Sequence, residues 1–138
     1  MGQLIVIGGG IRSGKSRWAL RLAEQLGQRR CFVATGRPSD TEMQARIERH
    51  QRERADRYTT VECPIDLPGA ITAASEFDVV VVDCLTAWLS NLLYQDLDDG
   101  ALLDRTDQLI SSVAASGAHV LLVTNEVGLG LVALSELG

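Results

Sequence analysis

The stretch G-G-I-R-S-G-K-S, residues 9–16, fits the pattern G-x-x-x-x-G-K-[ST] of a loop that holds nucleotide phosphates. An apolar run at 4–7 precedes it, and a segment with helical periodicity follows at about 15–26. Glycines let the backbone approach the phosphates, and the N–H groups of the loop and the helix start supply positive potential. We expect Lys15 to reach the β- and γ-phosphates and Ser16 to bind Mg²⁺. The predicted phosphate-binding residues are Gly9, Gly10, Ile11, Arg12, Ser13, Gly14, Lys15 and Ser16.

Composition restricts the remaining possibilities. The chain has 138 residues, which suits a single domain over 1–138, and 46% of them are apolar. A net charge of −5 argues against a broad nucleic-acid-binding surface. No apolar run approaches the ~18 residues that a membrane span needs. Three cysteines without C-x-x-C spacing predict reduced, structural thiols in a cytoplasmic protein.

Apolar runs alternate with segments of helical periodicity along the whole chain. This alternation predicts an α/β fold, a mostly parallel sheet with helices on both faces. The run 4–7 is expected to be buried on both faces, Trp18 and Trp88 to lie in the core, and 96–100 to form an acidic loop. The predicted strands are 4–7, 31–35, 58–62, 79–82 and 120–123. The predicted helices are 15–26, 42–57, 66–74, 85–94 and 102–115, with another beginning near 132.

Asp83 follows the valine run 79–82 and is expected at the carboxyl end of a strand. An acid in that position, downstream of a phosphate-binding loop, is placed to hold the Mg²⁺ shell. Aspartate also suits turns, so the residue alone would not decide the question. Together with Lys15 and Ser16, it predicts a metal-assisted phosphate site.

His50 is the second candidate for chemistry. Arg46 and Arg54 stand four residues to either side, so one face of a mainly polar helix can present all three side chains. Neighbouring cations disfavour imidazolium and keep a nitrogen lone pair available, while the arginines can bind phosphate oxygens. Such a histidine can act as a nucleophile toward phosphorus or as a base. On the evidence of this helix alone, however, a solvated surface histidine on a charged helix is the favoured interpretation. His119, beside a predicted strand, is interpreted as structural.

Several segments together resemble one enzyme family. They are G-G-I-R-S-G-K-S at 9–16, A-T-G at 34–36, E-M-Q-A-R-I-E-R-H-Q-R-E-R at 42–54, T-V-E at 60–62, V-V-V-D-C-L-T-A-W-L-S-N-L-L at 80–93 and L-V-T-N-E-V-G-L-G-L-V at 122–132. The chain is similar, in collinear order, to the bifunctional adenosylcobinamide kinases/adenosylcobinamide-phosphate guanylyltransferases of cobalamin biosynthesis. The resemblance implies a P-loop NTPase fold of the RecA-like kind and a homotrimer.

The resemblance also implies two reactions with Mg²⁺ and the substrates ATP and GTP. Adenosylcobinamide would be phosphorylated, and a guanylyl-histidine at His50 would then pass GMP to adenosylcobinamide phosphate. The implied catalytic residues are His50 and Lys15, and the implied metal ligands are Ser16 and Asp83. Besides residues 9–16, the implied nucleotide contacts are Ala34, Thr35, Gly36, Gln51, Arg52, Glu53, Arg54, Glu62 and Asp83.

The chain departs from the family pattern at Ala55, Tyr58 and Ala133, where proline, tryptophan and proline are common. It also ends before a helix and a strand that family members usually have. Two other functions therefore remain open at this stage. One is a simple P-loop kinase or NTPase without a covalent intermediate, and the other is a nucleotide-binding module without activity.

Overall fold

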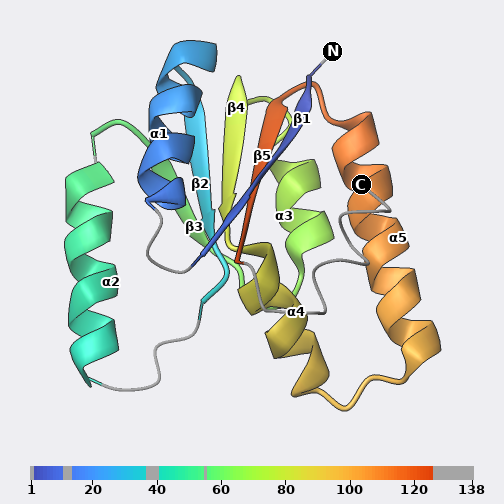
Figure 1. The fold of residues 1–138 in the computed structure, drawn as a ribbon. Coiled ribbons are helices and arrows are strands. Elements are labelled where there is room, and N and C mark those ends of the chain that lie inside the picture. Colours follow the sequence, from blue (N-terminus) through green and yellow to red (C-terminus); the bar gives the residue numbers. More distant parts are fainter. Residues whose placement is uncertain (1, 11–13, 37–40, 55, 126–138) are drawn as a thin grey trace.

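The computed structural model describes residues 2–10, 14–36, 41–54 and 56–125, which form a five-stranded sheet with helices around it (Figure 1). The strand order is β1-β5-β4-β2-β3, and every pairing is parallel. The strands are β1 (Leu4–Gly9), β2 (Arg30–Ala34), β3 (Thr59–Glu62), β4 (Val79–Asp83) and β5 (His119–Asn125). The helices are α1 (Lys15–Leu26), α2 (Thr41–Arg54), α3 (Leu67–Ala73), α4 (Leu85–Leu93) and α5 (Asp99–Ala115).

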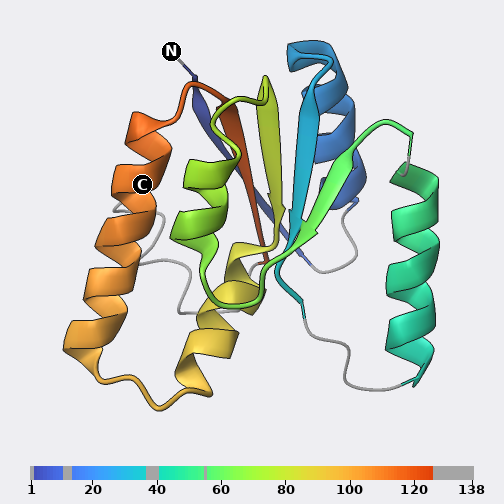
Figure 2. The ribbon, with the colours of Figure 1, turned by 180° about the vertical axis from the view of Figure 1, so that it is seen from behind.

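The helices divide between the two faces of the sheet. One core contains α1 with Phe32 and Tyr58, and the other contains residues of α3, α4 and α5 around Trp88. Helix α2 stands at the β3 side of the sheet, outside both layers, as the two opposite views show (Figures 1 and 2). The predicted α/β sheet covered on both faces is therefore confirmed, and α2 is the element that the two cores do not explain.

Strand β4 lies at the centre of the sheet, between β2 and β5. Its four valines, 79–82, are at most 1% exposed, and each lies in one of the two cores. An uninterrupted apolar run suits a parallel strand that is covered on both faces. The run ends at Asp83, so the burial of β4 fixes the position of this carboxylate at the carboxyl edge of the sheet.

The expectation that 4–7 is buried on both faces is wrong. Leu4 and Val6 are 53% and 57% exposed, whereas Ile7 belongs to the α1-side core. Strand β1 is an edge strand that pairs only with β5 among the described strands. Helix α1 covers its Ile7 face, and the described residues leave its other face open.

Helix α1 has the predicted bounds, but Trp18 is not in the core. Its side chain is 56% exposed, while Ala19 and Ala23 are fully buried against the sheet. Small residues allow a helix to approach a sheet closely, so the buried face of α1 follows its alanines and leaves Trp18 on the flank. The same expectation for Trp88 is confirmed, because this residue is fully buried in the opposite layer and donates from Nε1 to the Ile65 carbonyl.

Two helix starts show how local capping decides boundaries, and a third boundary differs from its prediction. Helix α3 lies within the predicted range 66–74, and Asp66 caps it by accepting the Gly69 N–H at 3.1 Å. Helix α5 begins at Asp99 and not at 102, because Asp98 accepts the Ala101 N–H at 2.8 Å. Part of the expected acidic loop is thus a helix start. Helix α2 ends at Arg54, short of the predicted 57. The segment near 132, where another helix was predicted to begin, lies outside the described residues.

Candidate nucleotide-binding site

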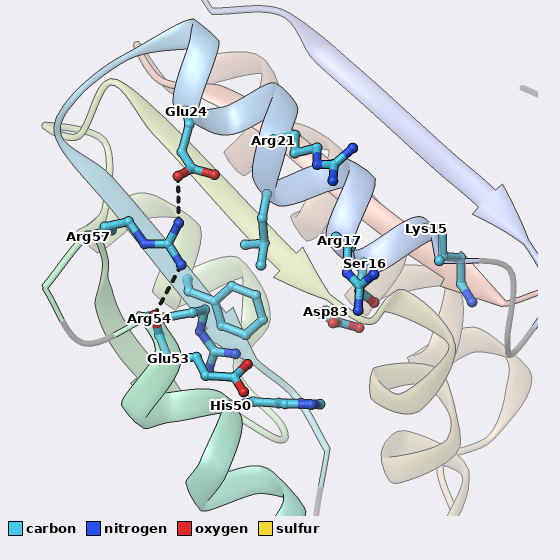
Figure 3. A pocket seen from close by; sticks show the side chains of 13 residues that line it. Lys15, Ser16, Arg17, Arg21, Glu24, His50, Glu53, Arg54, Arg57 and Asp83 are labelled. Atoms are coloured by element: carbon cyan, nitrogen blue, oxygen red, sulfur yellow. Dashed lines mark hydrogen bonds and ion pairs between the residues drawn. The ribbon is translucent and has the colours of Figure 1, made fainter.

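A cavity of about 610 Å³ lies between α1, the end of β4 and α2 (Figure 3). It brings the helix after the phosphate-binding loop together with Asp83 and His50, which are far apart in the sequence. Its described lining residues are Gly14, Lys15, Ser16, Arg17, Leu20, Arg21, Glu24, Phe32, His50, Glu53, Arg54, Arg57 and Asp83.

The phosphate-binding end of the cavity is formed by the start of α1. Gly14 precedes the helix with φ 79°, a conformation that glycine adopts without strain, and its carbonyl accepts the Trp18 N–H at 3.0 Å. Lys15 is only 8% exposed, and its Nζ donates to the Gly10 carbonyl at 2.8 Å. The lysine is therefore held against the loop that its motif predicts. Residues 11–13 of the motif lie outside the described residues.

Ser16 and Asp83, the two predicted metal ligands, both line this end of the cavity. A hydroxyl and a carboxylate are oxygen donors of the kind that Mg²⁺ prefers. The described residues contain no group of three or more His, Cys, Asp or Glu side chains that could hold a metal ion. Mg²⁺ does not need such a group, because it usually keeps waters and is bound by one or two protein ligands plus substrate phosphates. The residues present therefore fit this metal.

A buried network of polar groups holds the backbone of Asp83 and the adjacent Cys84 in place. The Thr35 hydroxyl donates to the Cys84 carbonyl at 2.6 Å and accepts the Cys84 N–H at 2.8 Å, and the Thr35 N–H donates to the Asp83 carbonyl. Asn91 Nδ2 donates to the carbonyls of Thr35 and Pro64. This network ties the ends of β2 and β4 to α4 and fixes the backbone beneath the Asp83 carboxylate.

The Thr35 hydroxyl therefore makes its hydrogen bonds to the Cys84 backbone within the protein. Its side chain is buried and occupied by Cys84, and the segment Ala34–Gly36 is not among the described residues that line the cavity. The sequence interpretation assigned this segment to nucleotide contact. That assignment stays a prediction, and what the structure shows for Thr35 is a supporting role under Asp83.

The three described cysteines are free thiols, as expected. Burial raises the pKa of Cys31 to about 11 and also raises the pKa values of Cys63 and Cys84. Each thiol is therefore protonated and weakly nucleophilic at neutral pH. They do not compete with His50 as a nucleophile.

His50 lies on α2, at the opposite side of the cavity. Its ring is exposed and points from α2 into the cavity (Figure 3). Glu53 and Arg54 line the same side, whereas Arg46 and Arg52 are not among the described lining residues. The predicted pairing of His50 with Arg54 is thus brought together in one cavity, and Arg46 does not join it.

Arg54 is the most unusual side chain of the site. It is 7% exposed, its guanidinium carbon lies 3.6 Å from the centre of the Phe32 ring, and its Nε is buried without a hydrogen-bond partner. Burial lowers the pKa of this guanidinium, and the nearby charge of Asp83 opposes the change. A buried cation with an unused donor in a cavity is a candidate binding group for an anion.

Gln51 and Glu62, two further predicted nucleotide contacts, meet each other. Gln51 Nε2 donates to Glu62 Oε1 at 2.8 Å, and this bond joins α2 to the end of β3. Neither residue is among the described lining residues of the cavity. Their contact with nucleotide, like that of Arg52, stays a prediction.

The sequence interpretation missed one wall of the cavity. Arg17, Leu20, Arg21 and Glu24 line it from α1, and their spacing of three, four and seven residues marks one face of a helix. This spacing was visible in the sequence, but only the fold shows that α2 stands opposite that face. Phe32 and Arg57 were also missed, because neither belongs to a recognisable motif.

Comparison with known proteins identifies the family. The family model described as "Cobinamide kinase / cobinamide phosphate guanyltransferase" matches residues 5–138. The chain belongs to this family. It is 40% identical over 130 residues to the "Bifunctional adenosylcobalamin biosynthesis protein CobP" of Pseudomonas aeruginosa, an alignment that covers 94% of this chain and 75% of that protein.

Two enterobacterial relatives give the same result. The chain is 36% identical to the bifunctional adenosylcobalamin biosynthesis protein CobU of Salmonella typhimurium, over 94% of this chain and 78% of the relative. It is 37% identical to CobU of Escherichia coli, over 97% of this chain and 81% of the relative. Members of the family are named for two activities, a kinase and a guanyltransferase, so the predicted family is confirmed.

The fold agrees with a more distant structure. The crystal structure of the RadB recombinase superposes with a TM-score of 0.57 at 19% identity, covering 90% of this chain and 61% of that chain. A likeness at this identity concerns the fold alone, and it confirms the predicted RecA-like P-loop NTPase architecture. No helix among the described residues is long and apolar enough to cross a membrane.

Proposed function

We propose that this chain is a bifunctional transferase that phosphorylates adenosylcobinamide with ATP or GTP and then guanylylates the product with GTP through His50. One observation carries the proposal: a single cavity holds the phosphate-binding end, with Lys15, Ser16 and Asp83, and also His50. The names of the family and its relatives, which specify a kinase and a guanyltransferase of cobinamide, support both reactions.

In the kinase step, a hydroxyl oxygen of adenosylcobinamide attacks the γ-phosphorus of the donor. The bond from that phosphorus to its bridging oxygen breaks, the nucleoside diphosphate leaves with the electron pair, and the hydroxyl proton passes to solvent water. Lys15 and the loop N–H groups hold the donor phosphates and offset their charge. Mg²⁺ held by Ser16 and Asp83 would neutralise further negative charge on these phosphates.

In the guanylyl step, a ring nitrogen of His50 attacks the α-phosphorus of GTP. A phosphorus–nitrogen bond forms, and the bond from the α-phosphorus to the oxygen that bridges to the β-phosphorus breaks. Pyrophosphate leaves with the electron pair of the broken bond. The residues that hold the β- and γ-phosphates in the kinase step hold the leaving pyrophosphate here. A covalent intermediate divides one difficult transfer into two easier ones.

Arg54 is suited to the guanylyl step. It lies one helical turn after His50, and Phe32 supports its guanidinium from one side. Its buried, unpaired Nε and lowered pKa indicate a cation whose solvation is incomplete until an anion arrives. We assign it to the α-phosphate, where negative charge must be stabilised as pyrophosphate leaves.

Incubation with GTP labelled at the α-phosphate tests the proposal. We expect an acid-labile, base-stable label on the protein, and we expect the label to be absent from His50→Ala. The matched control is His119→Ala, since His119 lies on β5 and is not among the described cavity-lining residues. Transfer of γ-phosphate without α-label would instead favour a simple kinase or NTPase, and nucleotide binding without either would favour an inactive module.

Two further predictions belong to this proposal. The resemblance predicts a homotrimer, which light scattering of the purified protein would test. Free thiols are typical of a reducing compartment, and the three free cysteines support a cytoplasmic location. A monomeric mass or an exported protein would contradict the respective prediction.

A further inference from the structure

Arg17 and Arg21 line the cavity from α1, and neither transfer step assigns them a role. They lie on successive turns of α1 and are both exposed (Figure 3). Neither guanidinium makes a hydrogen bond or ion pair with another residue in the part of the chain that the structure describes. Arg57, in contrast, is paired with Glu24 at 2.8 Å, and Arg54 stacks on Phe32.

This arrangement is electrostatically unfavourable without an anion. Like charges four residues apart on a helix repel each other, and their Cβ atoms are only about 6 Å apart. Five cationic side chains line the cavity against three carboxylates, although the whole chain carries a net charge of −5. Positive charge is therefore concentrated in the cavity as a whole, which favours the binding of more than one anionic group.

The two-step guanylyl transfer requires a second anion. Once His50 carries GMP, the acceptor must bring a phosphate monoester, of charge about −1.5 to −2, close to another phosphate group. Lys15 lies at the phosphate-binding end, and Arg54 is assigned to the guanylyl phosphate. The described cations left in the cavity without an acidic partner or a ring contact are those on the exposed face of α1.

We propose that Arg17 and Arg21 bind the phosphate monoester of the acceptor, cobinamide phosphate, opposite His50. The inference rests on the proposed function. In this step an oxygen of the acceptor phosphate attacks the phosphorus of the guanylyl group, the phosphorus–nitrogen bond breaks, and the imidazole leaves with the electron pair. A P–O–P linkage forms. The two arginines move no proton; they reduce the repulsion between the two phosphates and position the attacking oxygen.

Binding of the acceptor with and without its phosphate tests this directly. Affinities for cobinamide phosphate and for cobinamide are measured without GTP, on the wild type, Arg21→Gln, Arg17→Gln/Arg21→Gln and the control Arg105→Gln on α5. We expect Arg21→Gln to weaken binding of cobinamide phosphate about tenfold, as loss of a charge-assisted hydrogen bond does, and to leave cobinamide binding unchanged. Equal affinity of the wild type and the double variant for cobinamide phosphate would overturn the proposal.

Kinetics separate the acceptor from the nucleotide. In Arg21→Gln, the KM for cobinamide phosphate should rise about tenfold, the KM for GTP should not rise, and Arg21→Lys should recover part of the loss. A rise in the KM for GTP instead would assign these arginines to the nucleotide and contradict the proposal. If wild-type protein forms no α-label, the guanylyl function fails, while the phosphate-dependent difference in binding still decides the role of the arginines.

Discussion

The two sides of the cavity are built differently. On the sheet side, Asp83 ends a strand whose valines are at most 1% exposed, and the Thr35–Cys84–Asn91 network fixes the backbone below it. On the other side, α2 presents an exposed His50 and lies outside both cores. Helix α2 and the turn after it contact the rest of the chain through the pairs Gln51–Glu62, Arg54–Phe32 and Arg57–Glu24.

The difference separates two demands on the site. The phosphate-binding end needs preorganised donors and metal ligands, and burial in the sheet supplies them. The histidine must react with two different phosphates, and an exposed position on a helix beside the cavity allows both to reach it. Burial therefore stabilises the sheet side, whereas the proposed nucleophile lies on α2, outside both cores. Substitutions in the network around Thr35 should mainly lower stability, and substitutions beside His50 should mainly slow labelling.

Replacement of Arg54 should give the largest effect. Arg54→Met keeps an unbranched chain over Phe32 but removes the buried cation. We expect formation of the α-label to slow by about 100-fold, the size expected for losing one transition-state donor. The free energy of unfolding should change little, because methionine keeps an apolar contact with Phe32 and the buried Nε has no hydrogen-bond partner to lose. Arg49→Met, an exposed change on the same helix, should label at the wild-type rate; a 100-fold loss there as well would show that α2 itself is damaged.

Replacement of Thr35 should show the opposite profile. Thr35→Val keeps the shape but leaves the Cys84 N–H and carbonyl without the hydroxyl that pairs them. We expect the free energy of unfolding to fall by about 2 kcal/mol, within the usual cost of unsatisfied buried groups. Urea denaturation would measure this, with Thr59→Val on β3 as the control. An unchanged midpoint would contradict the supporting role of the network.

The sequence predicted the sheet side better than the α2 side, for physical reasons. Uninterrupted valines require burial on both faces, so β4 and the place of Asp83 follow directly from 79–82. The prediction that 4–7 is buried on both faces was wrong, because an edge position depends on strand order, which no local pattern encodes. Trp18 misled because small alanines, not the largest apolar side chain, set the buried face of α1.

The candidate site residues also divide into those that a local pattern specifies and those that depend on the whole fold. Lys15, Ser16 and Asp83 were predicted because a motif and a strand end specify them locally. His50 was a candidate from its neighbours, and the fold was needed to show that it faces the phosphate-binding end. Arg21 was missed because nothing local indicates what stands opposite a helix face.

Alkaline pH should weaken the sheet side through Cys31. Burial raises its pKa from 9.0 to about 11, so its contribution is complete below pH 9 and is lost as pH rises toward 11. Between pH 8 and pH 10 the free energy of unfolding should fall by about 1 kcal/mol more in the wild type than in Cys31→Val. Denaturation at the two pH values measures this difference. The same pH dependence in both proteins would contradict this prediction, because it would mean that the Cys31 thiol has the same pKa in the folded and in the unfolded chain.

The ion pair between α1 and the turn after α2 should contribute least. Arg57 and Glu24 are 50% and 29% exposed, so solvent screens their attraction. We expect Glu24→Gln to lower the free energy of unfolding by less than about 1 kcal/mol, with Glu76→Gln as the matched control. A loss of several kcal/mol would contradict this prediction, because the ion pair would then contribute far more to stability than a solvent-screened surface pair.

The central claim is that one phosphate-binding end serves both transfers. It is tested by measuring two rates on Lys15→Ala, the phosphorylation of adenosylcobinamide and the formation of α-label from GTP. If one cavity holds the γ-phosphate in the first reaction and the leaving pyrophosphate in the second, both rates should fall by at least about 100-fold. Loss of phosphorylation with wild-type α-labelling would contradict the claim, because His50 would then draw its GTP from a separate site.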